Sequence, residues 1–401
     1  MSVDDDLVSF PFPRPAELWG FPPEYEKLRA DAPVARVKLP NGLEAWLAFG
    51  HAEARQVLVD QRFSRALATR HPISRMAPNR ILNSSLIGTD APDHTRLRKL
   101  VAHAFTVRRI EALRPSVVAE LDHLAGVMEQ QPRPVDLVPH LTRPMPFATT
   151  ARMMGAPRED WPRLQQLSTD VLAGPWSDPE QVAAADAELV DYLDRLLATK
   201  ADAPSDDLFS VLVQAREGDD RLSHQEIVEL AVLLLVAGHE STTTLLGHCI
   251  LALLRQREQW DRLLAEPELV PAAAEELLRL QRRTEIGDAF ARVAAEDVEL
   301  GGVLVKAGDV VLPALDAADR DPEVFDRPDE LDFERPANPH LVFGAGIHRC
   351  IGAQLALMET EEALRMLLRR FPTLRLACSP EELRLNPRLQ IRALESLPVT
   401  W

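Results

Sequence analysis

Apolar residues recur at helical spacing through most of the chain. The pattern predicts helices through most of residues 107–200, broken by prolines, and further helices over 51–60, Pro271–Gln281 and 351–371. The longest helical pattern without a proline runs from Ser223 to about Arg255. Such a helix would be ~50 Å long at about 1.5 Å per residue, so it would cross the whole molecule and bury its middle.

Short strand-like stretches form two predicted hairpins. In the first, over Val34–Phe49, two β-compatible runs flank Pro40-Asn41-Gly42, and Asn-Gly is a strong hairpin-turn signal. In the second, over Val298–Val305, Gly301-Gly302 forms the turn. The tail from Thr373 on contains further short strand-like pieces. The predicted fold class is therefore mainly α with a minor β part.

Segments without a clear period separate these elements. Residues 64–92 are predicted to form a long irregular loop, and Asp93 can N-cap the helix that follows. Residues 313–342 are rich in proline and aspartate and form a predicted meander. Ser223 and Glu226 form a capping box at the start of the long helix. Because no linker interrupts the chain, we predict a single domain of all 401 residues.

Composition narrows the classes of partner and the compartment. The formal net charge of −17 argues against a nucleic-acid partner, because phosphate binding needs a basic face. The 3 cysteines are too few, and odd in number, for a disulfide framework, which indicates a reducing compartment. The N-terminal Met1–Asp6 lacks the basic and apolar parts of a signal peptide, and no stretch approaches the roughly 20 apolar residues of a membrane span. We expect a cytoplasmic protein without a membrane partner.

The most informative stretch is the ten-residue run from Phe343 to Gly352, which places Cys350 between a glycine-rich loop and a helix. Backbone N–H groups of the loop and the helix N-terminus would stabilise a thiolate there, and that geometry suits an axial ligand of haem iron. Gly344 lets the backbone approach a flat cofactor closely. The pattern F-G-x-G-x-H-x-C-x-G, which includes His348, resembles the haem-ligand signature of the cytochrome P450 family, the haem-thiolate monooxygenases. A buried structural cysteine is the alternative that the pattern disfavours.

A second motif lies in the middle of the long helix. There Ala237 and Gly238 precede an acid, Glu240, and two alcohols, Ser241 and Thr242. The acid–alcohol pair resembles the oxygen-activation motif of the family, in which the alcohol contacts the oxygen and the acid supports a proton relay. The resemblance implies that Ala237 and Gly238 lie against the haem. Ser241 stands where threonine is usual, so which of the two alcohols serves the oxygen stays open. The alternative is a polar helix face whose serine bonds back to the preceding turn.

Four basic side chains match family positions that contact the haem propionates. His94 and Arg98 are spaced i, i+4 on a predicted helix and share one face. Arg292 precedes the second hairpin, and His348 lies two residues before the cysteine. Propionates need cationic or hydrogen-bonding partners, which these residues would supply. For each residue taken alone, a solvated surface position is the alternative.

An E-x-x-R pair occurs between the two motifs. Glu276 and Arg279 are spaced i, i+3, so they can pair on one helix face. The resemblance implies a structural role for this pair, linked with an arginine of the meander, Arg335.

The resemblance places the substrate contacts in four segments: residues 65–90, 165–185, 281–288 and 389–391. The third is polar for an oily pocket, since it contains Arg282, Arg283 and Glu285. If they face the haem, the substrate should carry polar or amide groups, because buried polar groups need partners. We favour the alternative that they point to solvent.

The source of electrons must lie outside the chain. No G-x-G-x-x-G motif opens a βαβ unit, so no nucleotide-binding module is predicted. The resemblance implies a ferredoxin and a ferredoxin reductase as donors. Arg349, with Arg108 and Arg109, would form a basic docking patch on an acidic protein, and ordinary surface charge is an equal alternative.

The residues and the resemblance together predict a haem b protein with Cys350 as the proximal ligand. We expect it to use O2 to hydroxylate or otherwise oxidise a small organic molecule of secondary metabolism. Oxidative C–C or C–N coupling of an aromatic or peptide-like substrate, without oxygen insertion, is the alternative within the family. A haem-binding or sensor protein without turnover is the alternative from another class.

Overall fold

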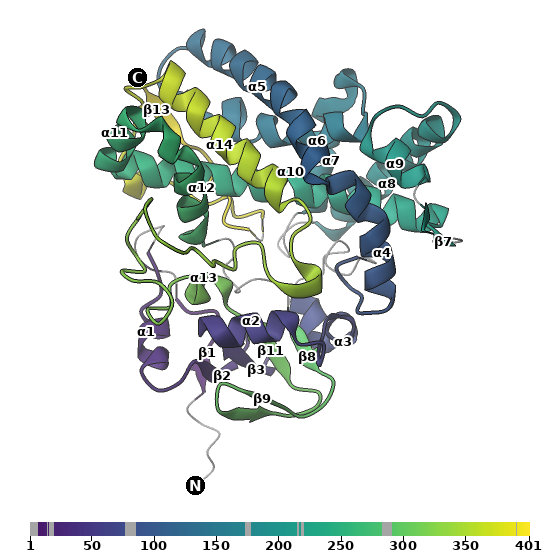
Figure 1. The fold of residues 1–401 in the computed structure, drawn as a ribbon, viewed down its shortest axis with the longest axis vertical. Helices are drawn as coiled ribbons and strands as arrows, with labels where there is room; N and C mark the ends of the chain where they lie inside the picture. The colour runs from purple at the N-terminus through teal and green to yellow at the C-terminus, as the bar shows by residue number, and fades with distance from the viewer. Residues whose placement is uncertain are drawn as a thin grey trace.

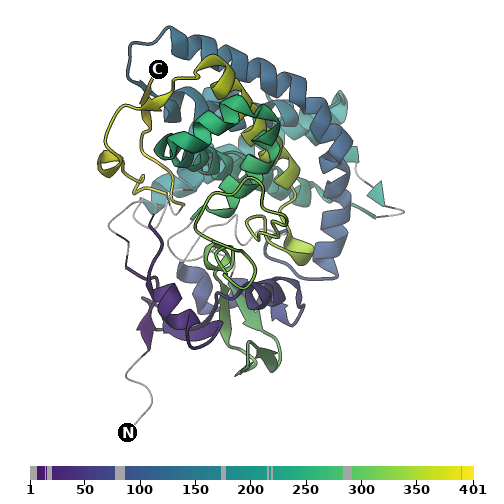
Figure 2. The same cartoon turned by 60° about the vertical axis from the view of Figure 1, so that its left-hand side comes forward.

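The computed structural model describes residues 7–13, 15, 20–76, 86–172, 178–214, 216–217, 220–282, 291–389 and 391–401. Most helices gather in one part of the molecule, and the largest sheet lies in the other with α2 (His51–Val59) beside it (Figure 1). The same division is visible when the molecule is turned (Figure 2). The yellow-green stretch that leads into α14 (Ala353–Arg370) runs between the two parts.

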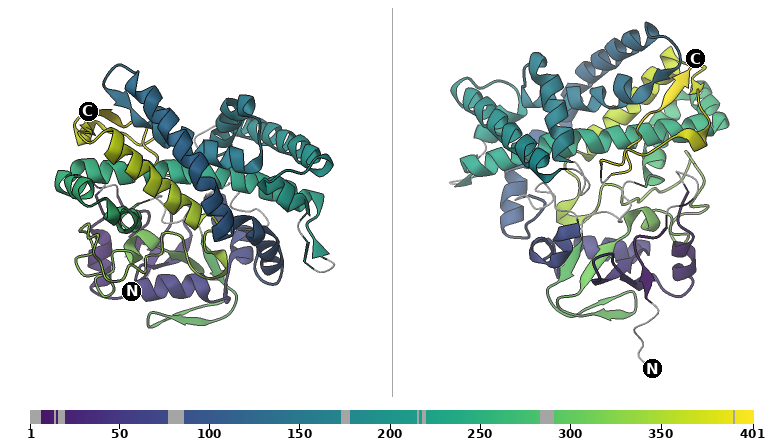
Figure 3. Two further views of the ribbon diagram at one scale, coloured as in Figure 1. Left: turned by 45° about the horizontal axis from the view of Figure 1, so that its top comes forward. Right: turned by 180° about the vertical axis from the view of Figure 1, so that it is seen from behind.

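The central element is α10 (His224–Arg255), a helix of 32 residues that spans the helical part in both views of Figure 3. The predicted capping box is confirmed, because the Ser223 side chain accepts from the backbone of Glu226 and the Glu226 side chain accepts from the backbone of Ser223. By length and composition α10 could cross a membrane, contrary to the expectation from sequence. However, 83% of its most apolar window is buried inside the protein, as in the core helix of a compact fold.

Helices packed on α10 form the main core. One group contacts it through α6 (Pro144–Met154), α7 (Trp161–Val171) and α8 (Pro179–Asp202). On another side lie α5 (Val107–Glu129), which packs on α14, and α12 (Val270–Arg279). The helices predicted within 107–200, 51–60, 271–281 and 351–371 are therefore confirmed. Further helices are α1 (Glu24–Arg29), α9 (Leu208–Gln214) and α11 (Arg257–Ala265).

The largest sheet has six strands in the order β1-β2-β3-β11-β8-β4. The strands are β1 (Val8–Ser9), β2 (Val34–Lys38), β3 (Glu44–Ala48), β11 (Val310–Pro313), β8 (Arg292–Ala294) and β4 (Phe63–Ser64). The first predicted hairpin is confirmed as the antiparallel pair β2–β3, with Val34 opposite Ala48. Its turn residue Gly42 has a φ of 81°, which glycine adopts without strain.

The second predicted hairpin is confirmed as β9 (Val298–Leu300) paired with β10 (Val303–Val305). Both turn glycines have positive φ, 55° and 81°, as a tight two-residue turn requires. The other strands are β5 (Val135–Asp136), β6 (Arg216–Glu217), β7 (Asp220–Arg221), β12 (Arg375–Leu376) and β13 (Pro398–Thr400). The tail thus contains strands, as predicted.

Two predicted irregular segments contain helices instead. The segment 64–92 includes α3 (Arg65–Arg70) and a 3-10 helix, Pro72–Met76. The segment 313–342 includes α13 (Leu315–Ala318). Asp93 is not an N-cap, because it is already the first residue of α4 (Asp93–Ala102) and Pro92 precedes it without a side-chain cap.

Asp90 makes the bonds that explain α3. Its carboxylate accepts from the hydroxyl of Ser64 at 2.5 Å and from the backbone N–H groups of Arg65 and Ala66 at 2.9 and 3.2 Å. The Ser64 side chain in turn accepts from the backbone of Leu67. The start of α3 therefore has its free N–H groups satisfied by a residue that lies 25 positions away from Arg65.

Candidate active site

The cysteine loop is a closed turn in which Cys350 is exposed. The backbone N–H of Cys350 donates to the carbonyl of Phe343 at 2.8 Å, and Cys350 is exposed while Phe343 is buried. Gly344 and Gly346 have φ values of 68° and 69°. A Cβ on Gly346 would lie 2.6 Å from the carbonyl oxygen of Leu58 in α2, whereas one on Gly344 would meet no atom within 4 Å. Gly346 is thus needed for packing on α2, and Gly344 leaves open space beside the loop.

The middle of α10 also has an open face. Ala237 and Ser241 are exposed, although the helix around them is mostly buried. They are spaced i, i+4 and so share one face. On another face, a Cβ on Gly238 would lie 3.2 Å from the hydroxyl of Thr150, so the glycine allows α6 to approach α10. Ala237 and Ser241 therefore leave one face of the helix middle open, and Gly238 lets α6 pack closely on another.

The two alcohols of α10 differ in exposure. The Ser241 hydroxyl donates to the carbonyl of Ala237 at 2.6 Å, and the Thr242 hydroxyl donates to that of Gly238 at 3.2 Å. Both therefore bond back to the preceding turn, which was the alternative considered for serine. Thr242 is buried and Ser241 is exposed, so only Ser241 presents its hydroxyl on the open face.

Glu240 is completely buried and lies between α10 and α7. Its Oε2 atom is 3.1 Å from Nε2 of His239 and accepts from the Thr169 hydroxyl at 3.4 Å. Burial alone would raise the pKa of Glu240, but His239 and the charge of Arg143 outweigh it, so that the pKa falls below its usual value. His239 also contacts the Ser168 hydroxyl at 3.2 Å through Nδ1. The acid is thus held by α7 and His239, and sequence reasoning did not identify these partners.

Two of the predicted propionate partners lie against each other. The ring centroids of His94 and His348 are 4.3 Å apart. Both ring nitrogens of His94, and Nε2 of His348, are buried without a hydrogen-bond partner among the described residues. Burial and neighbouring arginines lower the pKa of His94 to about 4 and that of His348 to about 2, so both rings are neutral at pH 7. Such neutral, unsatisfied N–H groups need an acceptor.

Arginines surround the two histidines. Arg292 is buried, and Nη1 lies 3.5 Å from the carbonyl oxygen of Ala291, which also accepts from Arg65 at 3.1 Å. Burial lowers the pKa of Arg292 to about 9, with a further contribution from the charge of Arg65. Arg98 donates to the carbonyl of Arg349, next to the cysteine, at 2.6 Å. Arg65 is a member of this cluster that sequence reasoning missed, because α3 was predicted to be a loop.

These features fit haem. The thiol of an exposed cysteine can serve as the axial ligand, and the open space beside Ala237 and Gly344 suits a flat ring. The arginine–histidine cluster is a site for anions, since converging buried cations need negative charge nearby. The two propionates of haem would supply it, and the buried histidine nitrogens would gain acceptors.

Comparisons with known proteins agree with this geometry. The family model described as cytochrome P450 matches residues 33–386. The chain belongs to the cytochrome P450 family. It is 44% identical to nocardicin C N-oxygenase from Nocardia uniformis subsp. tsuyamanensis, over 99% of both chains. Its cofactor is therefore haem, and it is a monooxygenase rather than a haem-binding protein without turnover.

Solved P450 structures have the same fold. The LnmA hydroxylase from the leinamycin biosynthetic pathway of Streptomyces atroolivaceus superimposes with a TM-score of 0.92 at 39% identity, covering 98% of this chain and 100% of that one. A P450 with biaryl coupling reactivity reaches a TM-score of 0.91 at 39% identity, over 99% and 100%. The predicted fold class, mainly α and P450-like with a long central helix, is confirmed.

The E-x-x-R pair forms the structural network that was predicted. Glu276 accepts from Nε of Arg279 at 2.8 Å and from Nη2 of Arg335 at 3.1 Å, and all three side chains are buried. The two arginines outweigh the effect of burial and hold the pKa of Glu276 below its usual value. Arg279 also donates to the backbone carbonyls of Asp319 and Pro328. The network therefore joins α12 to the meander.

One expectation about the polar stretch after α12 is wrong. Arg282 does not point to solvent, because it is buried, donates to the carbonyl of Gly20 at 3.0 Å and lies 3.6 Å from Asp316. It joins the N-terminal segment to α13. Arg283 and Glu285 lie outside the described residues, as do parts of the predicted substrate segments.

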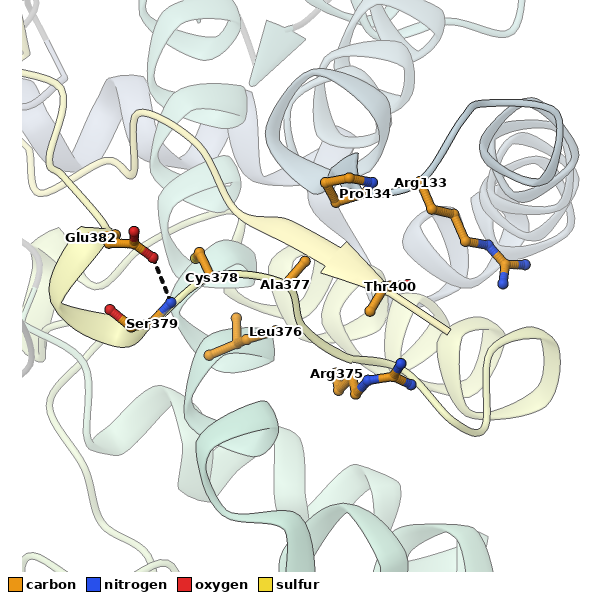
Figure 4. Close-up of a pocket in the computed structure, with 9 residues that line it drawn as sticks. All are labelled: Arg133, Pro134, Arg375, Leu376, Ala377, Cys378, Ser379, Glu382 and Thr400. Carbon is orange, nitrogen blue, oxygen red and sulfur yellow. Dashed lines mark hydrogen bonds between the residues drawn. The ribbon is translucent and has the colours of Figure 1, made fainter.

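A hollow of about 620 Å³ lies elsewhere, beside β12 and β13 (Figure 4). Arg133, Arg375 and Cys378 are among its lining residues. None of the predicted site residues lines it, so it is separate from the site described above.

Proposed function

We propose that this monooxygenase inserts one oxygen atom into a small molecule of secondary metabolism, in the cytoplasm. The observation that carries the proposal is the juxtaposition of an exposed Cys350 loop with the arginine–histidine cluster, through the bond from Arg98 to the carbonyl of Arg349. The similarity to an N-oxygenase and to a biosynthetic hydroxylase supports oxygen insertion.

Haem would be held from three sides. Cys350 would ligate the iron, with Phe343, Gly344 and Gly352 against the ring on the cysteine side. Ala237 would lie against the opposite face, and Gly238, predicted to lie there too, lets α6 approach the helix beside it. The propionate partners would be His94, Arg98, Arg292 and His348. When bound, haem supplies the activation of O2 and the transfer of one oxygen atom.

Proton delivery would fall to α10. We assign the reacting hydroxyl to Ser241, because it lies on the open face while Thr242 is buried. Glu240 would accept a proton at Oε2, the carboxylate oxygen that His239 and Thr169 contact. Rotation of the Glu240 side chain away from α7 would then bring the proton to Oγ of Ser241. Thr242 would support the helix through its bond to Gly238.

Two matched variants test this assignment. Ser241→Ala should lower the share of consumed electrons that appears in product by about tenfold or more, with the remainder released as peroxide, because a positioned proton donor is lost. Thr242→Val should behave like the unmodified protein. Product and peroxide per NADPH consumed are the quantities to measure. The reverse order of effects would assign the role to Thr242.

Electrons would come from a ferredoxin and its reductase. Arg349 and Arg108 are exposed and would supply the positive charge of the predicted docking patch. Reduction by an acidic ferredoxin should slow as salt rises, because screening weakens contacts between exposed charges.

Oxidative coupling is the second candidate, and the similarity to a P450 with biaryl coupling reactivity favours it. Under labelled O2, oxygen insertion gives a product that carries one labelled oxygen atom. Coupling gives a product that has lost two hydrogen atoms and carries no label. Product mass therefore decides between the two.

A further inference from the structure

A histidine outside the site described above lies on the open side of α10. His248 follows Ser241 by seven residues, which is close to two helical turns, so the two residues share a face about 10 Å apart along the axis. The side chain is partly buried, and Nε2 lies 2.7 Å from the carbonyl oxygen of Arg392. A side chain on the same face of α10 as Ser241 therefore contacts a segment that lies 144 positions further along the chain.

The contacted segment is one arm of a hairpin. Leu385 and Leu394 form an antiparallel bridge, and the backbone N–H of Asn386 donates to the carbonyl of Ala393 at 2.8 Å. The returning arm, Ile391–Leu394, packs directly on α10, where a Cβ on Gly247 would lie 3.5 Å from Leu394. The close approach at Gly247 and the bond at His248 hold this arm on two adjacent residues of the helix.

The other arm of the hairpin reaches α7. Arg388 lies 3.8 Å from Asp170, which follows the Thr169 that contacts Glu240. The hairpin therefore spans from α10 to α7, the two helices between which Glu240 is buried. Of its two anchors, the ion pair is largely exposed and contributes little. The bond from His248 is short and partly buried, and it is the stronger anchor.

The chemistry of the bond fixes the state of the ring. A carbonyl oxygen only accepts, so Nε2 must carry the proton. Burial lowers the pKa of His248 to about 4, so the ring is neutral at pH 7 and has a single N–H, which this bond uses. Removing the ring would remove the His248 donor from the Arg392 carbonyl, at a site where water has limited access.

We propose that His248 is a positioning residue for substrate recognition, which holds the arm Ile391–Leu394 against α10 so that the hairpin forms a fixed wall of the pocket next to Ser241. The proposal rests on the proposed function, because it takes the open face of α10 as the substrate side. Its consequence is that His248 controls the fit of bulky ligands in the pocket without contacting haem.

The test uses two nitrogenous probes that bind haem iron directly. Imidazole is small and reports ligation alone, whereas 4-phenylimidazole also fills the surrounding pocket. His248→Leu should weaken 4-phenylimidazole about tenfold, because the loss of a buried hydrogen bond releases the wall, and should leave imidazole unchanged. His248→Gln keeps an N–H donor at similar reach and should restore the affinity for 4-phenylimidazole. Arg388→Ala is the matched control at the weaker anchor and should change neither ligand.

Hydrogen exchange supplies a readout that does not depend on ligand binding. The amides of residues 392–394 should exchange faster in His248→Leu than in the unmodified protein, and His248→Gln should restore protection. Equal affinities of unmodified protein and His248→Leu for both probes, with equal exchange, would overturn the proposal. A failure of the proposed function looks different, since the unmodified protein itself would then lack the red-shifted Soret band of thiolate ligation.

Discussion

Two buried clusters of charge in this protein differ in whether their N–H groups have acceptors. Around Glu276, one carboxylate meets two arginines, and backbone carbonyls accept the remaining N–H groups. Around Arg292, three arginines and two neutral histidines gather, and the carboxylate of Asp90 is engaged with the start of α3. The first cluster is complete within the chain. In the second, both ring nitrogens of His94 and Nε2 of His348 are buried without a hydrogen-bond partner in the part of the chain that the structure describes.

The difference separates a structural network from a binding site. A complete buried network stabilises the fold, because each charge has partners that replace water. A buried cluster of like charge costs stability unless an anion joins it. Among the described residues, Arg65, Arg98 and Arg292 gather around the two histidines and Asp90, and two ionised propionates would add negative charge there. Both clusters are rich in arginine, so the composition of a site does not distinguish these roles, whereas the presence of buried nitrogens without hydrogen-bond partners does.

Removing the carboxylate of the complete network should have the largest effect on folding. Glu276→Ala leaves Arg279 and Arg335 buried without their counter-charge and should lower the free energy of unfolding by about 3–5 kcal/mol. Urea denaturation of the apoprotein measures this. Glu330→Ala, which breaks an exposed pair with Arg327, is the control and should cost less than about 1 kcal/mol. Equal effects of the two substitutions would contradict the structural role.

Removing a cation from the other cluster should have the opposite pattern. Arg292→Met relieves like-charge crowding, so the apoprotein should unfold at the same urea concentration as the unmodified apoprotein or a higher one. The holoprotein should transfer haem to apomyoglobin about tenfold faster, because a charge-assisted hydrogen bond is lost. A destabilised apoprotein with unchanged haem transfer would assign Arg292 to the fold instead of the cofactor.

The pH dependence should give the smallest effect. The pKa of Glu276 is lower in the folded state than its usual value of 4.5, so the unfolded chain takes up the proton first as the pH falls. The stabilisation by Glu276 is therefore complete above about pH 4.5 and is lost below it. The difference in stability between the unmodified apoprotein and Glu276→Ala should shrink between pH 7 and pH 4. A difference that does not change with pH would show that Glu276 has the same pKa in the folded and unfolded states, which would contradict its pairing with the two arginines.

Local signals in the sequence were sufficient for much of the fold. Asn41-Gly42 and Gly301-Gly302 each predict a hairpin because few residues adopt positive φ. Ser223 and Glu226 form their capping box within four residues, so the sequence alone predicts where α10 begins. The closely spaced pattern around Cys350 likewise predicted the thiol loop.

Features that depend on partners far away in the sequence could not be predicted from local signals. The start of α3 depends on Asp90 as well as on its own N-cap Ser64, and a helix of 6 residues gives little periodic pattern, so Arg65 was missed. The sequence predicts a solvent-exposed Arg282, because its partner, the carbonyl of Gly20, lies 262 positions away. Gly346 is constrained by the backbone of α2, which no motif around the cysteine indicates. The sequence therefore shows which chemistry is present more readily than which side chains meet.

The most direct test of the central claim is the absorbance spectrum of the reduced, carbon-monoxide-bound protein, compared with Cys350→Ser. We expect the red-shifted Soret band of thiolate ligation in the unmodified protein and its loss in the variant, because Cys350 supplies the only proposed thiolate. A histidine-like Soret position in the unmodified protein, or a red-shifted band that persists in Cys350→Ser, would contradict the assignment of Cys350 as the ligand.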